Sequence, residues 1–150
     1  MEKYGTYGKN MKNRSLPILG WREWVTFPLL NLPPMKAKID TGARSSALHA
    51  FDIQLFDSYL RYKIHPFQKD DQTIVEIESP FLGCKMVRSS NGQVESRPVI
   101  HTQVTLGVQS WDIELTLTNR DLMGFRLLLG RQAIRNRYWV DPGRSFLHRA

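Results

Sequence analysis

An aspartate followed by small residues is the feature of this 150-residue sequence with the clearest chemical potential. In "KAKIDTGA" an alternating stretch delivers Asp40 immediately before Thr41, Gly42 and Ala43. Aspartate close to glycine is common in turns, so a structural Asx turn explains Asp40 and Gly42. The alternative is a reactive carboxylate. Two carboxyl groups about 3 Å apart share one proton, which provides an acid and a base in one site.

A second stretch, "FRLLLGRQAI" at 125–134, favours the reactive reading of Asp40. It lies about 90 residues further on and carries an aliphatic run that ends in Gly130 and Arg131. A structural turn at Asp40 leaves this second element unexplained. We therefore interpret Asp40 as a catalytic residue, with Gly130 and Arg131 as structural support for its loop.

The segments that would position these residues alternate with the period of a β-strand. Strands are expected at 21–27, 35–39, 45–50, 52–56, 59–64 and 73–78, with turns or loops at 31–34, 57–58 and 68–71. The pair Asn91-Gly92 predicts a tight hairpin within 84–100, because both residues tolerate positive φ. Two further arms, 101–106 and 110–118, join around Gly107, and a short helix begins near Arg131. This pattern predicts an all-β fold, a small closed β-barrel with one short helix near the C-terminus.

Length and composition are typical of a single globular domain, which we expect over 17–150 after a flexible tail at 1–16. No apolar run approaches the roughly 20 residues that cross a bilayer, so no membrane partner is expected. Cys84 is the single cysteine, which favours a reducing compartment and a cytoplasmic location. Its surroundings show no activating cation cluster, so we expect a small buried hydrophobe rather than a nucleophile.

The net charge of +7 points to an anionic partner, which leaves an acidic peptide, nucleic acid or a membrane surface open. The basic residues are scattered rather than gathered in an aromatic-laced patch, so nucleic acid is the less favoured partner. Nucleotide-binding and H-E-x-x-H motifs are absent from the sequence. His49 could ligate a metal, but a lone strand histidine is more often packed or at the surface. We therefore expect no cofactor and no metal site.

Three separated blocks, "AKIDTGA", "SSNG" and "LLLGRQAI", resemble the retroviral-type (retropepsin-like) aspartic proteases. The stretch from "GWREWV" to "VDPGRSFL" is closely similar to the bacterial proteins named ATP-dependent zinc proteases. Those small proteins often accompany ATP-grasp glutamate ligases of the ribosomal-protein-modifying type. The resemblance implies an acid-protease fold and an aspartic endopeptidase. It also implies a homodimer, because each subunit supplies one Asp40 to the catalytic pair.

The resemblance also distributes roles among the remaining residues. Thr41 and Gly42 complete the catalytic loop, since a hydroxyl ties the loop to its counterpart and a glycine permits close approach of the backbone. Substrate-binding residues are expected in the catalytic loop and around the flap hairpin, namely Ala43, Arg44, Arg88, Ser89, Ser90, Asn91, Gly92 and Arg97. Arg44 stands where the retroviral enzymes usually carry an acid, so Arg131 must find a different partner. Three arginines around one cleft favour an acidic substrate, such as a Glu-rich segment or an oligoglutamate tail.

A second hypothesis remains open beside the peptidase. A non-catalytic β-barrel binding module would use the same basic surface to hold an acidic peptide or RNA.

Overall fold

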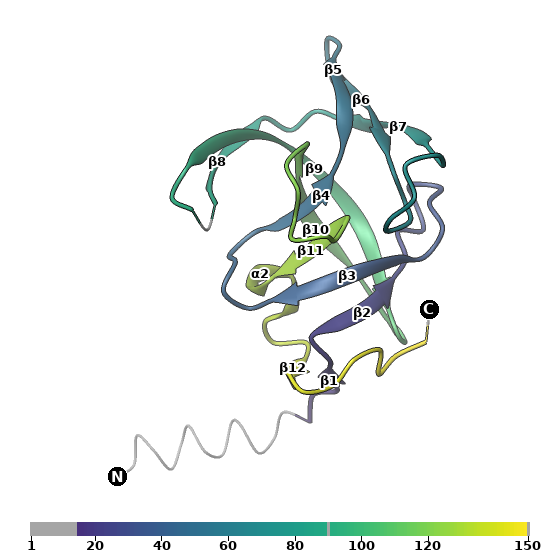
Figure 1. Cartoon of the computed structure of the whole chain (residues 1–150), viewed down its shortest axis with the longest axis vertical. Helices are drawn as coiled ribbons and strands as arrows, with labels where there is room; N and C mark the ends of the chain where they lie inside the picture. Colours follow the sequence, from purple (N-terminus) through teal and green to yellow (C-terminus); the bar gives the residue numbers. More distant parts are fainter. Residues whose placement is uncertain (1–14, 90, 150) are drawn as a thin grey trace.

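The computed structural model describes residues 15–89 and 91–149 as an all-β protein with one short helix. Figure 1 shows a three-stranded sheet at the top of the view, a large sheet in the centre and a two-stranded pair at the bottom. The central sheet has seven strands in the order β2-β3-β11-β4-β10-β9-β8. The expected tail at 1–16 falls almost entirely outside the described residues.

The central sheet is built from segments that the sequence predicts as strands, apart from β11, which lies in the aliphatic run before Arg131 and is buried at every residue. Its strands are β2 (Arg22–Val25), β3 (Met35–Asp40), β4 (Ser46–His49), β8 (Cys84–Arg88), β9 (Val94–Leu106), β10 (Gln109–Thr118) and β11 (Leu127–Gly130). In β3 the side chains of Met35, Ala37 and Ile39 are buried, whereas those of Lys36 and Lys38 are partly exposed. Period-two alternation therefore places one face of this strand on the core, as the sequence indicates.

The two smaller sheets flank the central one. Strands β5 (Phe51–Leu55), β6 (Tyr59–Ile64) and β7 (Val75–Pro80) form an antiparallel sheet, which confirms the predicted hairpin around 57–58. Strands β1 (Ile18–Leu19) and β12 (Trp139–Val140) pair in parallel, and the alternating pattern gives no sign of this pair. The helix α2 (Arg131–Ile134) follows β11 directly, as predicted.

Strand β9 serves both hairpins that the sequence indicates. It pairs with β8 through Val94–Pro98 and with β10 through Val99–Leu106, so one continuous strand runs from the flap hairpin into the body of the protein. In Figure 1 the β8–β9 hairpin arches away from the body on the left of the view. Cys84, the first residue of β8, is exposed, so the prediction of a buried cysteine is wrong. The reason is that β8 is an edge strand in a projecting hairpin, where no core is available to cover the thiol.

The sheets are open, so the predicted closed barrel is not confirmed. Strands β2 and β8 are the edges of the central sheet. Beyond β2, an isolated bridge joins Thr26 to Thr105 of β9, with backbone hydrogen bonds of 3.0 and 2.8 Å. Pro28 follows two residues later and has no N–H to extend this ladder. The sheet therefore curls towards closure but completes it only through a single bridge.

The core is formed by side chains of both the curled central sheet and the three-stranded sheet. Its largest fully buried side chains include Tyr62, Phe27, Leu48, Leu115 and Leu127. The described residues contain no helix of the length and apolar character that crossing a membrane requires.

Candidate active site

The candidate catalytic loop begins where β3 ends, beside the end of a parallel strand. Strand β11 runs parallel to β3, and Gly130 lies opposite Asp40 in the register. The chain then turns through residues 41–45 and enters β4, which pairs antiparallel with β11. The Asp40 loop and the Gly130-Arg131 element, about 90 residues apart in the sequence, thus lie side by side. The interpretation of Asp40 as a catalytic residue requires this arrangement.

Backbone hydrogen bonds fasten the loop to the start of α2. The N–H of Arg131 donates to the carbonyl of Ala43 at 2.8 Å, and the N–H of Gln132 donates to the carbonyl of Arg44 at 3.2 Å. Gly130 N–H donates to the Ser46 hydroxyl at 3.1 Å. A Cβ on Gly130 would lie 2.4 Å from the carbonyl oxygen of Ser45, a separation that real structures do not tolerate. Only glycine fits this position, since the two backbones are in contact.

The carboxylate of Asp40 is anchored by one oxygen. Its Oδ1 accepts the N–H groups of Gly42 at 3.0 Å and Ala43 at 3.2 Å. Its Oδ2 accepts no hydrogen bond from any residue that the structure describes, and the side chain is partly exposed. The loop therefore holds the carboxyl group in one orientation and leaves one oxygen available for a water, a substrate or a second carboxylate.

Arg131 finds a partner in the backbone of the candidate catalytic loop. Its Nη1 donates to the carbonyl of Gly42 at 3.2 Å. Since Arg44 replaces the acid of the retroviral pattern, this carbonyl takes the place of a carboxylate partner. Thr41 and Gly42 are exposed at the tip of the loop.

A cleft of about 400 Å³ opens beside Asp40. It is bounded by the candidate catalytic loop, by the β8–β9 hairpin, here called the flap hairpin, and by the 120–123 segment. Its lining residues are Asp40, Gly42, Ala43, Arg44, Ser45, Ala47, Met86, Val87, Arg88, Ser89, Arg97, Arg120, Asp121, Leu122, Met123 and Leu128. Ala47, Leu122 and Leu128 form a small buried apolar cluster with Ala43 packed against it. The cleft thus combines an apolar floor with four arginines at its walls.

The flap hairpin supplies Arg88, Ser89 and Arg97 to the cleft, and the environments of its two arginines differ. Arg88 is exposed, and its Nη1 lies 3.5 Å from the carbonyl of Gly92. Arg97 is only 6% exposed, and its Nε donates to the Glu95 carboxylate at 3.2 Å. Arg97 therefore lies in the wall of the cleft, with Glu95 as its fixed partner.

The tip of the flap is a compact turn. Ser89 donates its N–H to the carbonyl of Gln93 at 2.8 Å and accepts the N–H of Gly92 at 2.9 Å. Gly92 has a φ of +85°, in the region that favours glycine, as the Asn91-Gly92 pair predicts. The Ser89 hydroxyl also donates to the Asn91 side chain. Ser90, which the sequence assigns to the same tip, lies outside the described residues.

Arg120 is a cleft residue that the sequence analysis missed. Its Nε pairs with Glu95 at 3.0 Å, and its Nη1 donates to the Gln93 side chain at 2.8 Å. Thr118 also donates its hydroxyl to Glu95, at 3.1 Å. Arg120 thereby connects the flap hairpin to the segment after β10. The arginine-rich C-terminal third is a faint signal for it, but only the fold brings residue 120 next to residue 95.

His49 lies at the end of β4, outside the lining of the cleft. Burial, followed by the nearby Arg126 guanidinium, lowers its pKa below the ordinary 6.5. Its Nδ1 is buried without a hydrogen-bond partner among the described residues. Within residues 15–89 and 91–149, no three His, Cys, Asp or Glu side chains are grouped so that they could hold a metal ion. His49 therefore has no companion ligands there.

An all-β fold with an Asp-Thr-Gly loop beside a Gly-Arg element defines a protein of the retropepsin-like class. A family model described as RimB-like, retropepsin-like aspartic endopeptidase RimB, matches residues 18–150, and the chain belongs to this family. The resemblance to the retropepsin-like proteases is thereby confirmed.

Several relatives extend beyond the matched segment. A protein named "Probable alpha-L-glutamate ligase" from Shewanella halifaxensis is 44% identical over 133 residues, which cover 86% of this chain and 29% of that protein. Proteins with the same name from Desulfotalea psychrophila and Parasynechococcus marenigrum are 43% and 47% identical over 129 residues, which cover 83% of this chain and 28% of each relative. The chain thus spans less than a third of the length of these relatives.

A solved structure shares both the fold and a substantial part of the sequence. The crystal structure of a protein of unknown function from Legionella pneumophila is similar to this chain with a TM-score of 0.69 and 32% identity. The match covers 89% of this chain and 98% of the Legionella chain.

Proposed function

We propose that this protein is an aspartic endopeptidase in which Asp40 is the catalytic residue. The observation that carries the proposal is the Asp40 carboxylate, anchored through Oδ1 and free at Oδ2, at the edge of a cleft between the catalytic loop and a flap hairpin. Membership of a retropepsin-like endopeptidase family supports it independently. A purely structural Asx turn would need neither the cleft nor the flap.

The proposed chemistry requires a second carboxylate, which a homodimer would supply. The chain contains one Asp-Thr-Gly sequence, and a two-fold axis brings the same residue from each subunit to one point. Thr41 and Gly42 are exposed at the tip of the loop, as a contact with a second copy of the loop would require. In this proposal the Thr41 hydroxyl ties the two loops together, and Gly42 permits their close approach.

The reaction then follows from two carboxyl groups that share one proton. One ionised carboxylate takes a proton from a water molecule, whose oxygen bonds to the carbonyl carbon of the scissile peptide. The protonated partner donates a hydrogen bond to the carbonyl oxygen, which stabilises the negative charge that develops there. The carbon–nitrogen bond breaks as a proton passes to the leaving amine. The dyad needs no cofactor for these steps.

The arginines of the cleft support an acidic substrate. Arg44 and Arg88 are exposed at the cleft, and Arg97 lines its wall with only Nε engaged by a described residue. Guanidinium groups bind carboxylates through two parallel hydrogen bonds, so they suit glutamate side chains. The relatives named "Probable alpha-L-glutamate ligase" point towards the same chemistry, because their name describes the joining of glutamate. We therefore propose Glu-rich or oligoglutamate segments as substrates, with Ala43, Ser89, Asn91 and Gly92 lining the path of the peptide backbone.

A second candidate function is a binding module for acidic chains. The observation that favours it is the share of the relatives that this chain covers, less than a third of proteins named as ligases. In such a protein, an arginine-lined cleft would hold a glutamate chain without cutting it.

Cleavage of a defined peptide separates the two functions. We expect the protein to cut an α-linked oligoglutamate peptide, and Asp40→Asn to bind the peptide without cutting it. Asparagine keeps the Oδ1 acceptor for Gly42 and Ala43, so the loop should survive the substitution. A chelator should leave cleavage unchanged, because the dyad needs no metal. Tight binding by the unmodified protein without any product would favour the binding module, and full activity of Asp40→Asn would exclude the catalytic role.

A further inference from the structure

The outward face of β3 carries a row of charged residues that ends at the candidate catalytic aspartate. Met35, Ala37 and Ile39 point into the core, so Lys36, Lys38 and Asp40 share the opposite, partly exposed face. Alternate residues in a strand are about 6.8 Å apart. Lys38 therefore lies about 7 Å from Asp40 along the strand, and Lys36 about 14 Å from it.

Aromatic rings from the neighbouring strand region and the C-terminal segment hold two cations on this face, Arg22 and Lys36. Arg22 lies opposite Lys38 in the register, and Trp24 lies opposite Lys36. The guanidinium of Arg22 lies 4.6 Å from the ring centre of Trp21 and 4.9 Å from that of Phe146. The ammonium of Lys36 lies 5.4 Å from the ring centre of Trp24. Cation–π contacts restrain these long side chains, so less entropy remains to be lost when an anion binds.

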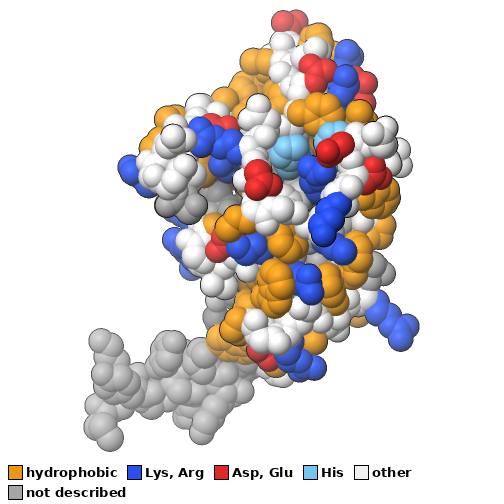
Figure 2. Space-filling model, in the orientation of Figure 1, with side chains coloured by type: hydrophobic (Ala, Val, Ile, Leu, Met, Phe, Trp, Pro, Cys, Tyr) orange, Lys and Arg blue, Asp and Glu red, His pale blue; other side chains and the backbone are white. Residues whose placement is uncertain are grey.

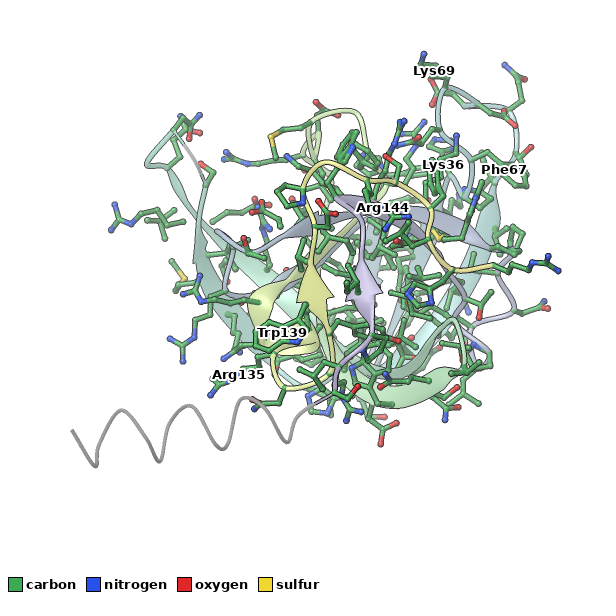
Figure 3. All side chains as sticks on the ribbon, turned by 90° about the horizontal axis from the view of Figure 1, so that it is seen from below. Lys36, Phe67, Lys69, Arg135, Trp139 and Arg144 are labelled. Atoms are coloured by element: carbon green, nitrogen blue, oxygen red, sulfur yellow. The ribbon has the colours of Figure 1, made fainter. Side chains whose placement is uncertain are left out.

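These cations lack acidic partners. Among the residues that the structure describes, Arg22, Lys36, Lys38 and Arg144 take part in no ion pair. Glu23, which lies between Arg22 and Trp24, is buried on the other face of β2 and bonds only to backbone N–H groups. Figure 2 shows blue and orange side chains mixed in the lower centre of the view, where Figure 1 places β2 and β3. In the view of Figure 3, the labels of Lys36 and Arg144 lie near each other. The face therefore retains uncompensated positive charge.

The charged row is continuous with the cleft. Lys38 Nζ lies 3.3 Å from Met123 Sδ, and Met123 lines the cleft. Leu128, which is opposite Lys38 on β11, belongs to the apolar floor. Asp121 at this rim is an acidic residue, and its Oδ1 accepts the N–H of Gly124. A chain leaving the cleft along β3 would thus meet Lys38 first and Lys36 next.

We propose that Lys38 and Lys36, with Arg22 beside Lys38, form a track that binds the carboxylates of an acidic substrate beyond the cleaved bond. The inference rests on the proposed function, because it extends the substrate path of the same cleft. An extended peptide presents side chains on one face every 6.6 to 6.8 Å, which is also the repeat of the track. An oligoglutamate chain in this conformation matches one carboxylate to each lysine.

The arrangement of the rings favours an acidic peptide over RNA as the occupant. Single-stranded nucleic acid is held when its bases stack on open aromatic faces. Here Trp21, Trp24 and Phe146 already carry cations from the protein itself. The groups presented outward are therefore ammonium and guanidinium groups, for which carboxylates are suitable partners.

Binding of oligoglutamates of two lengths to the catalytically inert Asp40→Asn protein tests the track. Binding is followed by fluorescence anisotropy of labelled α-linked peptides of four and twelve residues. The track variant carries Lys36→Gln and Lys38→Gln in addition to Asp40→Asn. The control variant carries Lys63→Gln with Arg135→Gln, which removes the same net charge from β6 and from the residue after α2. We expect about tenfold weaker binding of the long peptide to the track variant, a clearly smaller loss for the short peptide, and little change in the control.

Three outcomes would overturn the proposal. These are unchanged binding of the long peptide, an equal loss for both lengths, and an equal loss in the control. A twelve-residue oligouridylate that bound as tightly as the peptide and depended equally on both lysines would instead make the face a nucleic-acid site. Binding is measured without cleavage, so the two proposals can fail separately. If the unmodified protein cuts no oligoglutamate, but the lysine substitutions still weaken binding of the long peptide more than that of the short one, the catalytic function is refuted and the track is supported.

Discussion

Glu23 provides a demanding test of how the C-terminal segment is held. Its side chain is inaccessible to solvent, and Oε2 accepts the N–H groups of Gly20 at 2.7 Å and Leu147 at 3.0 Å. Oε1 accepts the N–H of His148 at 3.1 Å. One carboxylate therefore satisfies three backbone donors, two of them more than 120 residues away in the sequence. The substitution Glu23→Gln keeps the shape and removes one of the two acceptors.

The expected cost follows from these three bonds. A glutamine oxygen in the place of Oε2 keeps the bonds to Gly20 and Leu147, while its NH₂ group faces the N–H of His148. Loss of a hydrogen bond to a charged acceptor costs about 1.5–3 kcal/mol. Glutamine avoids the burial of a charge, which offsets part of this cost. We expect the free energy of unfolding to fall by about 2 kcal/mol, with a Tm about 6 °C lower for a domain of this size.

Urea unfolding followed by tryptophan fluorescence measures this change. The matched control is Glu78→Gln, because Glu78 is an exposed carboxylate paired with Arg61 and should contribute about 0–1 kcal/mol. Faster proteolysis of the C-terminal segment should accompany the loss in Glu23→Gln. A loss below about 0.5 kcal/mol, equal to the control, would refute the argument that three donors depend on this carboxylate.

Three further predictions concern the loop, the pH dependence and the substrate. Gly130→Ala should lower the free energy of unfolding by about 3 kcal/mol or more in urea titrations, because its Cβ would collide with the Ser45 carbonyl; a stable, active variant would contradict the close approach. Burial and Arg126 lower the pKa of His49, so its contribution to stability is complete above about pH 6.5 and is lost as the pH falls through the folded-state pKa. Unfolding free energies measured from pH 5 to 7 should therefore depend less on pH in His49→Gln, and equal slopes would contradict this assignment. Arg44→Ala should reduce the preference for Glu-rich over neutral peptides, and high salt should do the same to the unmodified protein; an unchanged kcat/KM ratio in both cases would exclude the role of Arg44.

Local patterns were sufficient to predict much of the fold. The alternation in 35–39 predicts β3 and its buried face, and Asn91-Gly92 predicts the flap turn. These features depend on neighbours in the sequence. The parallel pair β1–β12 was not predictable in this way, because two-residue strands carry no period and their pairing joins segments about 120 residues apart.

The residues of the candidate site also differ in how far the sequence could identify them. Asp40 and Gly130 could be identified because their motifs are local and resemble a known family. Arg120 could not be identified from the sequence, because its role depends on an ion pair with Glu95. Glu95 lies on β9, whereas Arg120 follows β10. The burial of Arg97 could not be predicted either, because alternation in a hairpin does not reveal which face packs against the rest of the protein.

In the proposed function, two copies of Asp40, one from each subunit, form the catalytic pair. Mixing the unmodified protein with Asp40→Asn at constant total concentration, followed by the rate of oligoglutamate cleavage, tests it most directly. If subunits exchange freely and both carboxylates are needed, only dimers of two unmodified subunits are active, so an equal mixture should retain about a quarter of the full rate. A rate that falls in simple proportion, to about half in the equal mixture, would show that each subunit acts alone and would rule out a catalytic pair shared between subunits.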